Sequence, residues 1–600
     1  MLCAIKQIGK LQRDKLNKNK LEVLVKNPKF KTVLLIIINL DKESYDGIRV
    51  EDIESTKKLK YLFTEGPSNG PNPTPIANIN IKEIKKTFFR KIQKWFDKYS
   101  TSTDLTKNEK LFLNSIKEII SKNKDRILND IEKDVKDIPT KEIKGLSIKI
   151  IKDRNSQYIG EFDIFKKILL NVDKEKSSDI SANDCYCSIC GIKRELVSGN
   201  LSVFTFYTID KPGFITGGFE KSLAWKNYPV CLECKFDMEE GRRYIEENMS
   251  SFNFCGIRYI LIPKLIFEDS NLLKKILEIL QESNKKISYL KKEERKNWKV
   301  IEEDILSILS NQPEKLTYNF LFLNISQSAE RIQLLIEDIF PSRIKKILEA
   351  RDAINKNTGK EFTFGDIRAF FQKSDDKKRN YDLDGYFLDI IDKVFRGVHI
   401  DFYFLNKFFM NRIRTDIKYY DSKTQEKNYF HASISRAIMS VLFFERLNLI
   451  SFEEVEDMDK SIFEDVFKKY GNVFATPVKR GLFLVGALTQ ILLDEQLKKR
   501  GSKPFLKKLK CLRMDENDIK SLLPEIQNKF EEYKSFSKSR KCIFQEAYNY
   551  LFTAGDRWNL TNDEINFYFA GGMNLAGSIK DIFYADEKDK DFEEENKKEG

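Results

Sequence analysis

Apolar positions change their spacing from one region of the chain to the next. Residues 32–40 form a continuous β-rich apolar run bounded by polar residues, which is typical of a buried strand. Across residues 81–151 apolar residues recur three and four positions apart among many Lys and Glu, which predicts mostly helix. A helical pattern returns over 271–309, residues 316–325 alternate as a strand does, and residues 328–340 resume helical spacing. We therefore expect a mixed α/β N-terminal domain.

From residue 344 onward the pattern is almost entirely helical. An apolar helix is expected over 481–493 and a further helix over 543–552. Residues 586–600 are mostly charged, with an acidic excess and almost no apolar residue, so we expect an acidic, solvated tail there. The predicted fold class is α+β, mostly helical, with a C-terminal helical bundle over residues 344–585.

Residues 185–263 differ in composition from the segments on either side. Cysteines cluster there, glycine and aromatic residues are frequent, and β-type runs such as 201–209 occur. We predict an inserted, β-rich subdomain. It separates an N-terminal domain, residues 1–184, from a continuation of that domain over residues 264–343. A chain of 600 residues is long enough for several such domains.

Four cysteines of this segment have the spacing of a metal site. Cys187 and Cys190 form one Cys-x-x-Cys pair, and Cys231 and Cys234 form a second pair after 40 intervening residues. Two such pairs supply the four thiolates that a tetrahedral structural zinc ion prefers. Free buried thiols and a redox pair are the alternatives, and Cys185 competes as a ligand. Because a closed four-sulfur site leaves no position for water, we expect zinc to be structural rather than catalytic.

Charge and histidine content narrow the classes of function. The chain has 105 Lys and Arg against 92 Asp and Glu, a net charge of +13, which favours a polyanionic partner such as nucleic acid. With two histidines, His399 and His431, it cannot build a site that needs three. We expect no signal peptide, no membrane span and a reducing, cytoplasmic location. The remaining cysteines are expected to be core thiols: Cys3, Cys255, Cys511 and Cys542.

Residues 66–75, GPSNGPNPTP, are a candidate for reading a short duplex motif. Prolines stiffen this loop, and glycines let another backbone come close. Asn69 and Asn72 can donate and accept hydrogen bonds at base edges. An ordinary surface turn has the same composition, so that alternative stays open.

The densest basic stretch lies between residues 479 and 513. Ten basic residues stand against two acidic ones, a net +8 over 35 residues. We predict that they contact the phosphates of a DNA strand without reading its sequence, and a solvated basic face is the alternative. Phe505 is a candidate for stacking on a base, although packing is commoner. The ten residues are Lys479, Arg480, Lys498, Lys499, Arg500, Lys503, Lys507, Lys508, Lys510 and Arg513.

Longer motifs of the chain point to a family. FYTIDKPGFITGGFEKSLAWKNYPVC stands at residues 206–231, between the cysteine pairs, and CKFDMEEGRRYI follows at 234–245. TYNFLFLNIS occupies 317–326, and AERIQLLIEDIFPSRIKKIL occupies 329–348. In order and sequence these segments closely resemble the large subunit of the subtype I-B CRISPR surveillance complex, Cascade. The resemblance extends over nearly the whole chain.

The resemblance implies a non-enzymatic subunit of an RNA-guided complex. Its N-terminal part is expected to lie near the 5′ handle of the CRISPR RNA and to help recognise the protospacer-adjacent motif. Its helical bundle is expected to contact the unwound target DNA. The implied partners are CRISPR RNA, target DNA, the backbone and small subunits of Cascade, and a helicase-nuclease recruited in trans. Guide pairing then reads most of the sequence, so the protein needs to read a short duplex signal.

The resembled family also suggests a second product of the same gene. Residues 453–455, Glu-Glu-Val, can be encoded as a ribosome-binding sequence just upstream of Met458. We expect Met458, with Met439 as the runner-up, to be an internal start that releases residues 458–600 as a separate small subunit.

Two other classes of function remain open at this stage. One is a zinc-containing DNA-binding regulator that acts alone, although no helix-turn-helix or finger spacing is recognisable. The other is a magnesium-dependent nuclease, because single Asp and Glu residues occur throughout the chain. Duplex binding without RNA would support the regulator, and magnesium-dependent cleavage by the pure chain would support the nuclease.

Overall fold

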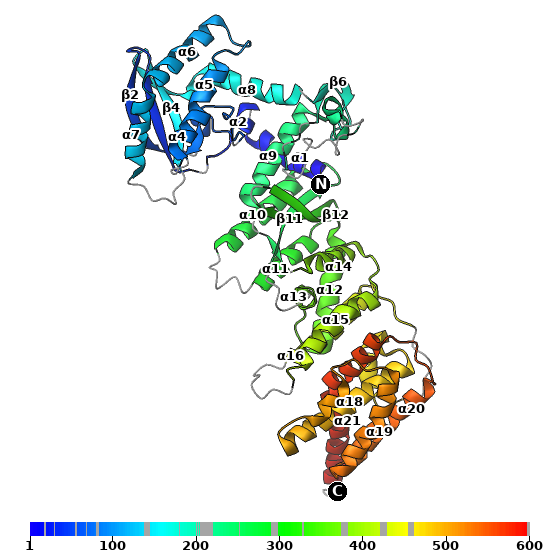
Figure 1. The fold of residues 1–600 in the computed structure, drawn as a ribbon. Coiled ribbons are helices and arrows are strands. Elements are labelled where there is room, and N and C mark those ends of the chain that lie inside the picture. Colours follow the sequence, from blue (N-terminus) through cyan, green and yellow to red (C-terminus); the bar gives the residue numbers. More distant parts are fainter. Residues whose placement is uncertain are drawn as a thin grey trace. The chain divides into compact units, whose positions relative to one another are not determined.

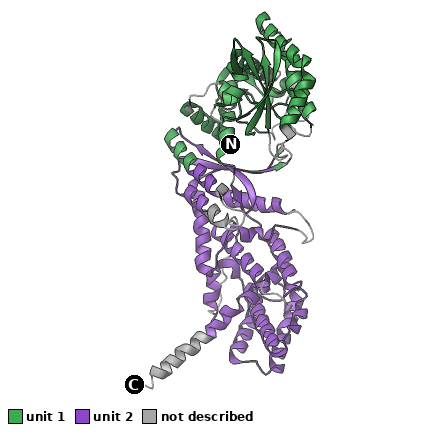
Figure 2. Ribbon diagram, turned by 90° about the vertical axis from the view of Figure 1, so that its left-hand side faces the viewer, with its two compact units in different colours: residues 1–249, 269–278, 325–330 green, residues 250–268, 279–324, 331–600 purple. Residues whose placement is uncertain are grey.

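In the computed structural model the chain divides into two compact units (Figure 2). Unit 1 consists of residues 1–249, 269–278 and 325–330, and unit 2 consists of residues 250–268, 279–324 and 331–600. The cysteine-containing segment up to residue 249 thus belongs to unit 1. Most of residues 264–343, which we expected to continue the N-terminal domain, belongs to unit 2. The structure describes residues 1–16, 20–28, 30–54, 57–67, 69–79, 83–136, 144–178, 180–199, 201, 203–204, 216, 220–250, 252–289, 298–326, 329–373, 382–420, 429–453 and 461–596.

The first part of unit 1 is a mixed sheet with helices (Figure 1). The elements up to residue 249 are α1 (Leu2–Leu16), α2 (Lys20–Leu24), β1 (Thr32–Asn39), β2 (Ser44–Asp52), α3 (Lys58–Tyr61), β3 (Ala77–Ile79), α4 (Ile84–Thr87), η3 (Phe88–Gln93), α5 (Lys94–Tyr99), α6 (Lys107–Lys122), α7 (Lys124–Lys136), β4 (Lys144–Lys152), β5 (Asn155–Tyr158), η4 (Ile159–Glu161), α8 (Asp163–Ser178), β6 (Ser181–Tyr186), β7 (Lys193–Ser198), η6 (Lys221–Asn227), β8 (Val230–Cys231) and α9 (Leu232–Asn248). The strand order is β2-β1-β4-β3, with β5 also paired to β4, and β1 and β4 run parallel. A second sheet has the order β6-β7-β8.

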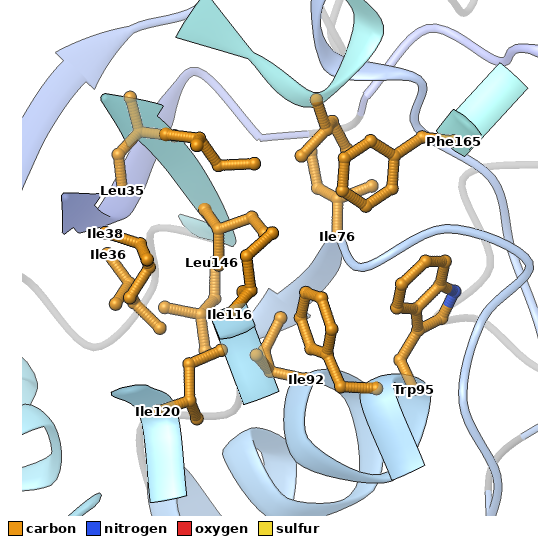
Figure 3. Close-up of a cluster of buried hydrophobic side chains, with 14 of the residues drawn as sticks. Leu35, Ile36, Ile38, Ile76, Ile92, Trp95, Ile116, Ile120, Leu146 and Phe165 are labelled. Carbon is orange, nitrogen blue, oxygen red and sulfur yellow. The ribbon is translucent and has the colours of Figure 1, made fainter. Parts of the chain in front are cut away.

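The apolar run over residues 32–40 is the buried strand β1, as its pattern predicts. Its side chains meet apolar residues of β4, α5, α6 and α8 in the core that Figure 3 shows. The Trp95 ring lies 5.4 Å from the Phe165 ring in this core. The labelled residues of Figure 3 are Leu35, Ile36, Ile38, Ile76, Ile92, Trp95, Ile116, Ile120, Leu146 and Phe165.

The end of the region that we predicted as mostly helical is a strand. Helices continue as far as Lys136, but residues 144–152 form β4 in the middle of the sheet. The apolar residues Leu146, Ile148 and Ile150 stand at every second position, which is the period of a strand, and the residues between them are buried as well. The prediction of helix was therefore wrong here, because partners on both sides make this segment part of the sheet.

In unit 1, α1 and α9 touch through their backbones. A Cβ atom added to Gly9 would lie 1.6 Å from the carbonyl oxygen of Asp237, and one added to Gly241 would lie 2.1 Å from that of Ile5. An ion pair of 2.8 Å between Arg13 and Asp237 crosses the same interface. The helix that follows the second cysteine pair is thereby held against the first helix of the chain.

Unit 2 combines an antiparallel sheet with many helices. The elements from residue 250 onward are β9 (Asn253–Phe254), β10 (Ile257–Leu265), α10 (Ser270–Tyr289), α11 (Trp298–Ser310), β11 (Leu316–Ser326), β12 (Ala329–Ile339), α12 (Pro341–Thr358), α13 (Phe364–Arg368), α14 (Asp384–Arg396), α15 (Phe402–Ile417), α16 (Tyr429–Arg446), α17 (Glu464–Lys469), η8 (Gly471–Phe474), α18 (Pro477–Arg500), η9 (Pro504–Leu509), α19 (Glu516–Glu532), α20 (Lys538–Thr553) and α21 (Asn562–Asn596). The sheet has the order β12-β11-β10-β9. The predicted strand over 316–325 and the helical C-terminal region are confirmed.

The helix predicted over residues 328–340 is wrong, because β12 occupies this segment. Ile332 and Ile336 have helical spacing, but the segment pairs with β11 instead. At Asp338 the backbone is left-handed, with φ of 60°, which an α-helix does not contain. The Asp338 N–H donates to Asn319 Oδ1 at 3.1 Å. Pairing with the neighbouring strand β11 therefore outweighs the helical spacing of the apolar residues.

The apolar helix predicted over residues 481–493 is the buried middle of α18. α18 runs along α21, and the two backbones touch at a pair of glycines (Figure 1). A Cβ added to Gly486 would lie 1.9 Å from the Phe569 carbonyl oxygen, and one added to Gly572 would lie 1.8 Å from that of Phe483. α18 is therefore the central helix of this bundle.

Three expectations about termini, membranes and cysteines can be compared with the described residues. α21 continues to Asn596, so the backbone of the expected tail is helical over the part that the structure describes. No described helix is both long and apolar enough to span a membrane. Cys3 and Cys511 are exposed, and Cys255 and Cys542 are partly buried, so the prediction that they are core thiols was wrong.

Candidate metal centre and nucleic-acid surfaces

The four predicted cysteine ligands converge on one point in unit 1. The Sγ atoms of Cys187, Cys190, Cys231 and Cys234 all lie within 4.8 Å of one another. In a tetrahedral site with Zn–S bonds of about 2.3 Å the sulfur atoms are about 3.8 Å apart, so a small contraction completes the coordination. Four soft sulfur donors and no described oxygen or nitrogen ligand suit zinc.

Backbone geometry positions the first pair after β6. The Cys187 N–H donates to the Ile192 carbonyl at 3.1 Å, and the Gly191 N–H donates to the Cys187 carbonyl at 2.9 Å. Gly191 takes a φ of 69°, in the left-handed region that favours glycine. The Ile189 N–H donates to the Cys187 sulfur at 3.4 Å. This tight turn brings Cys190 back towards Cys187.

The second pair lies at the start of a helix. Cys231 is the N-cap residue of α9, and Cys234 lies in the first turn. The N-terminus of a helix carries partial positive charge and stabilises thiolates. The Cys231 N–H also donates to the Cys187 sulfur at 3.3 Å, which joins the two pairs.

The thiols interact strongly with one another. A hydrogen bond from the Cys234 thiol lowers the pKa of Cys231 to about 5. The same bond and burial raise the pKa of Cys234. The guanidinium of Arg194, hydrogen-bonded to Cys190, brings positive charge to the cluster. Four thiolates repel one another at this separation, and a divalent cation removes that repulsion.

Cys185 lies outside the cluster. Its Sγ instead donates to the Asn183 carbonyl at 3.2 Å. The arrangement of the four other sulfurs is closed, so a metal held by them would have no position for water or substrate. What such a centre can do is fix β6, β7 and the start of α9 to one another.

The two asparagines of the loop at residues 66–75 that we proposed as base readers differ in their exposure. Asn69 is exposed and free to meet another molecule, whereas Asn72 is 5% exposed. The Asn72 amide donates to the Ile76 carbonyl at 2.7 Å. Trp95 Nε1 donates to a loop carbonyl at 3.1 Å. Asn72 holds the loop in shape and does not present its amide to a base, which removes it from the proposed reading surface.

Lys91 is a loop-contacting cation that the sequence reasoning did not find. Its Nζ donates to the Pro67 carbonyl at 2.7 Å and to Asn72 Oδ1 at 2.9 Å. Burial and the charge of Arg90 lower the pKa of Lys91. Within the described residues neither cation has a carboxylate partner. Both belong to η3, a π-helical turn, a form that is often found at functional sites.

Two residues of the predicted phosphate track are buried in the bundle. The Lys479 side chain is 6% exposed and pairs with Glu453 at 2.8 Å. The Arg480 side chain is 4% exposed and pairs with Glu464 at 2.8 Å. These two cations are buried and paired with carboxylates, so they lie outside any surface for phosphates.

A third residue of the track and the candidate stacking residue are buried as well. Lys503 is 7% exposed, and its Nζ lies 3.3 Å from the centre of the Tyr420 ring. Phe505 is 4% exposed. Phe505 therefore packs in the core, which is the alternative to stacking on a base.

The other seven residues of the track are exposed and differ in their partners. Four of them pair with carboxylates: Lys499 with Glu495, Arg500 with Glu532, Lys508 with Glu525 and Lys510 with Asp518. Among the described residues no carboxylate partner is found for Lys498, Lys507 and Arg513. The surface is basic, but its net charge is smaller than the sequence alone suggests.

Three family models match the chain in sequence order. All describe the CRISPR-associated protein TM1802 (cas_TM1802): the N-terminal domain matches residues 1–171, the central domain 184–339 and the C-terminal domain 362–587. The chain belongs to the Cas_TM1802 family. No curated protein matches the chain. The CRISPR-associated part of the resemblance is thereby confirmed.

The three Cas_TM1802 domains divide the candidate sites among them. The central domain contains all four clustered cysteines, the N-terminal domain contains the loop at 66–75, and the C-terminal domain contains the basic stretch. In this Cas_TM1802 protein, Lys91, its neighbour Arg90 and Arg194 are site residues that sequence reasoning missed. Arg194 lies four residues after Cys190, a position that could have drawn attention, whereas Lys91 is one of many lysines on a helical pattern.

Proposed function

We propose that this chain is the non-catalytic large subunit of a subtype I-B Cascade complex. The family membership over three consecutive domains carries the proposal, together with the motifs around the cysteine pairs. In this role the chain binds the 5′ end of the CRISPR RNA, helps to recognise the protospacer-adjacent motif, stabilises unwound DNA and recruits a helicase-nuclease for antiviral defence. Guide pairing supplies most of the sequence specificity.

The N-terminal loop is the proposed contact with the motif duplex. Asn69 is exposed there, and Lys91 has used two of its three donors on neutral oxygens. Asn69 then reads a base edge, while Lys91 and Arg90 bind phosphates of the same duplex.

This division of roles is tested with two single variants in the assembled complex. Asn69→Ala is expected to change the ranking of motif sequences. Lys91→Gln is expected to weaken binding to all motifs alike and to reduce the salt slope by about 1. Lys122→Gln, in a lysine paired with Glu118 on α6, is the control. An unchanged motif ranking for Asn69→Ala would remove the loop from motif recognition.

Zinc is the proposed cofactor, with a structural role. The four sulfur donors are the ligands that zinc prefers, and the helix N-terminus and Arg194 favour the thiolate form in which cysteines bind it. A closed four-thiolate site supports a non-catalytic function for this centre. Cys187, Cys190, Cys231 and Cys234 would hold the ion.

Residues 458–600 are proposed to be made also as a separate small subunit. Met458 itself lies outside the described residues. Support comes from the bundle, since α18, α19, α20 and α21 all lie within 458–600 and α18 packs on the other three. Met439, the runner-up, is buried in α16. Expression from the native codons should yield a C-terminal fragment that disappears in Met458→Leu, and persistence of the fragment would exclude this start.

The deciding experiment is recovery of bound RNA. The protein is tagged at its C-terminus, purified from its native host at low salt, and the co-purifying RNA is sequenced. Guides that share one repeat-derived 5′ end, together with several co-purifying Cas proteins, are the expected result. Absence of RNA, or RNA of random sequence, would contradict the proposed function.

A further inference from the structure

The outer face of α20 exposes two large aromatic side chains. Phe552 is 76% exposed, and Tyr548 is 54% exposed. Their ring centroids are 6.1 Å apart, and the ring planes differ by 18°. Single exposed aromatic side chains are common on protein surfaces. Two nearly parallel rings side by side, however, offer an apolar surface to a flat ligand.

A cationic and an amide side chain precede these rings on the same face of the helix. Lys541, Gln545, Tyr548 and Phe552 follow the spacing of one helix face and are all exposed. The distance along the helix from Lys541 to Phe552 is about 16 Å. Lys541 has no carboxylate partner among the described residues. The single carboxylate of α20, Glu546, binds the Ser461 hydroxyl at 3.0 Å.

More cations flank the N-terminal end of α20. Glu495 of α18 pairs with both Lys499 and Arg540, which places the basic end of α18 beside the first turns of α20. Lys538 is exposed on the same first turn. The cations therefore gather at one end of the face and the aromatic rings at the other.

We infer that the outer face of α20 is a stacking platform for unpaired DNA bases. Bases stack on exposed aromatic rings whatever their sequence, and lysines hold the backbone that connects them. A duplex offers phosphates but keeps its bases stacked on one another, so it gains nothing from the rings. A protein partner is disfavoured, because two aromatic rings alone form too small an apolar area for a stable interface.

The choice of DNA rests on the proposed function. In an RNA-guided complex the guide is paired with the target strand, and the displaced DNA strand is left unpaired. The platform is distinct from the track predicted between residues 479 and 513, since none of its aromatic residues lies in that segment. It continues the basic end of that track along a neighbouring helix.

The test compares two double variants of the full-length chain. Tyr548→Ala with Phe552→Ala removes both rings, whereas Tyr548→Phe with Phe552→Tyr keeps both. Binding of a fluorescent single-stranded DNA of mixed sequence is measured by anisotropy, beside its duplex and an RNA of the same sequence. We expect roughly 10-fold or greater weakening for the alanine pair on single-stranded DNA, near wild-type binding for the exchanged pair, and no change for the duplex.

Each other outcome contradicts the inference. Equal affinity of the alanine pair and the wild type would show that the rings do not stack on bases. A matching loss on duplex would show a general effect on phosphate binding, and ring-dependent binding of RNA that is as tight as that of DNA would overturn the assignment to DNA. Both side chains are exposed, so unchanged thermal melting is expected of both variants and is checked first.

A salt titration separates the two parts of the platform. Lys541→Gln should reduce the dependence of single-stranded DNA binding on salt by roughly 0.7 in slope, while the alanine pair should leave the slope unchanged. A reduced slope in the alanine pair would contradict stacking. These assays need no guide RNA. If the RNA-recovery experiment failed, the proposed function would be refuted, and the binding of single-stranded DNA to α20 could still be interpreted by itself.

Discussion

Two helix pairs, α1 with α9 in unit 1 and α18 with α21 in unit 2, touch backbone to backbone at glycines, yet they differ in the side chains that lie buried around the contact. The middle of α18, residues 481–493, is apolar almost throughout and wholly buried. In α9 the buried positions include four charged residues: Lys235, Asp237, Glu240 and Arg242. The close approach in unit 2 is therefore stabilised by the hydrophobic effect along the middle of α18, whereas the close approach in unit 1 includes buried charges.

This difference indicates what each unit requires in order to fold. Buried charges contribute little net stability even when they are paired, because removing them from water is costly. α9 needs another source of stability, and the cysteine cluster at its first turn can supply it through a metal ion. α18 is stabilised by its apolar neighbours and needs no such ion.

Removal of the metal ligands should have the largest effect and should be confined to unit 1. Cys231→Ser with Cys234→Ser is expected to abolish zinc binding and to unfold α9 locally, because metal-binding free energy of about 10 kcal/mol in small sites is folding free energy. Metal content and amide hydrogen exchange of α9 and α18 would measure this. The matched control is Cys185→Ser, which should keep both the metal and the exchange protection. Equal loss of protection in α18 would break the comparison.

The glycine contact of unit 2 can be tested by two alanines in one helix. A Cβ at Gly572 would meet the Phe483 carbonyl oxygen, whereas a Cβ at Gly577 would meet nothing within 4 Å. Gly572→Ala is expected to lower the free energy of unfolding by about 2 kcal/mol, since the helix backbones must separate. Gly577→Ala should raise it by up to about 1 kcal/mol through helix propensity. Chemical denaturation of unit 2 is the measurement, and equal effects of the two would contradict close backbone packing.

A buried histidine makes the stability of unit 2 depend on pH. Burial lowers the pKa of His431 to about 4, while its ring bonds to Tyr420 and Asn574. The pKa of this histidine is lower in the folded state than in the unfolded state, where it is 6.5. Its contribution to stability is therefore complete well above pH 6.5 and is lost as the pH falls towards 4. Between pH 7.5 and 5.0 the loss is about 2 kcal/mol. Unfolding of wild type and His431→Gln at both pH values should show this dependence in the wild type and less of it in the variant.

The smallest expected effect concerns surface charge in unit 2. Replacing Lys498, Lys507 and Arg513 by Gln should flatten the salt dependence of DNA binding by roughly 2 in slope, because these cations have no described carboxylate partner. The matched triple variant in Lys499, Lys508 and Lys510 should change the slope less, since carboxylates already compensate those charges. A larger change in the paired triple would remove the distinction between free and compensated cations.

Local patterns predicted the features that depend on residues close in sequence. The strand β1, the buried helix α18 and the cysteine pairs each follow from periodicity or spacing within one segment. The strand β4 was missed because its conformation depends on β1, which lies far away in the sequence. The strand β12 was missed because pairing with β11, the strand just before it, outweighs its helix-like spacing. A spacing of three or four between apolar residues in a short segment does not show whether a neighbouring strand is available to pair with that segment.

The predicted nucleic-acid residues differ from the observed surface for a similar reason. Composition gives the number of cations, but burial and ion pairing decide which of them are available. Lys479, Arg480 and Lys503 are buried although they belong to the densest basic stretch of the sequence. Asn72 is equally polar to Asn69, and only its contacts show that it stabilises the loop.

The hydrogen bonds that fix residues 69–75 of the loop also affect how it would bind. Thr74 donates to the Leu62 carbonyl at 2.7 Å, and its hydroxyl lies 2.9 Å from that of Thr64. A segment held in this way loses its conformational entropy when the protein folds, not when a ligand arrives. Association there should be limited by diffusion and orientation rather than by loop rearrangement. The association rate should therefore change with temperature only as much as solvent viscosity does.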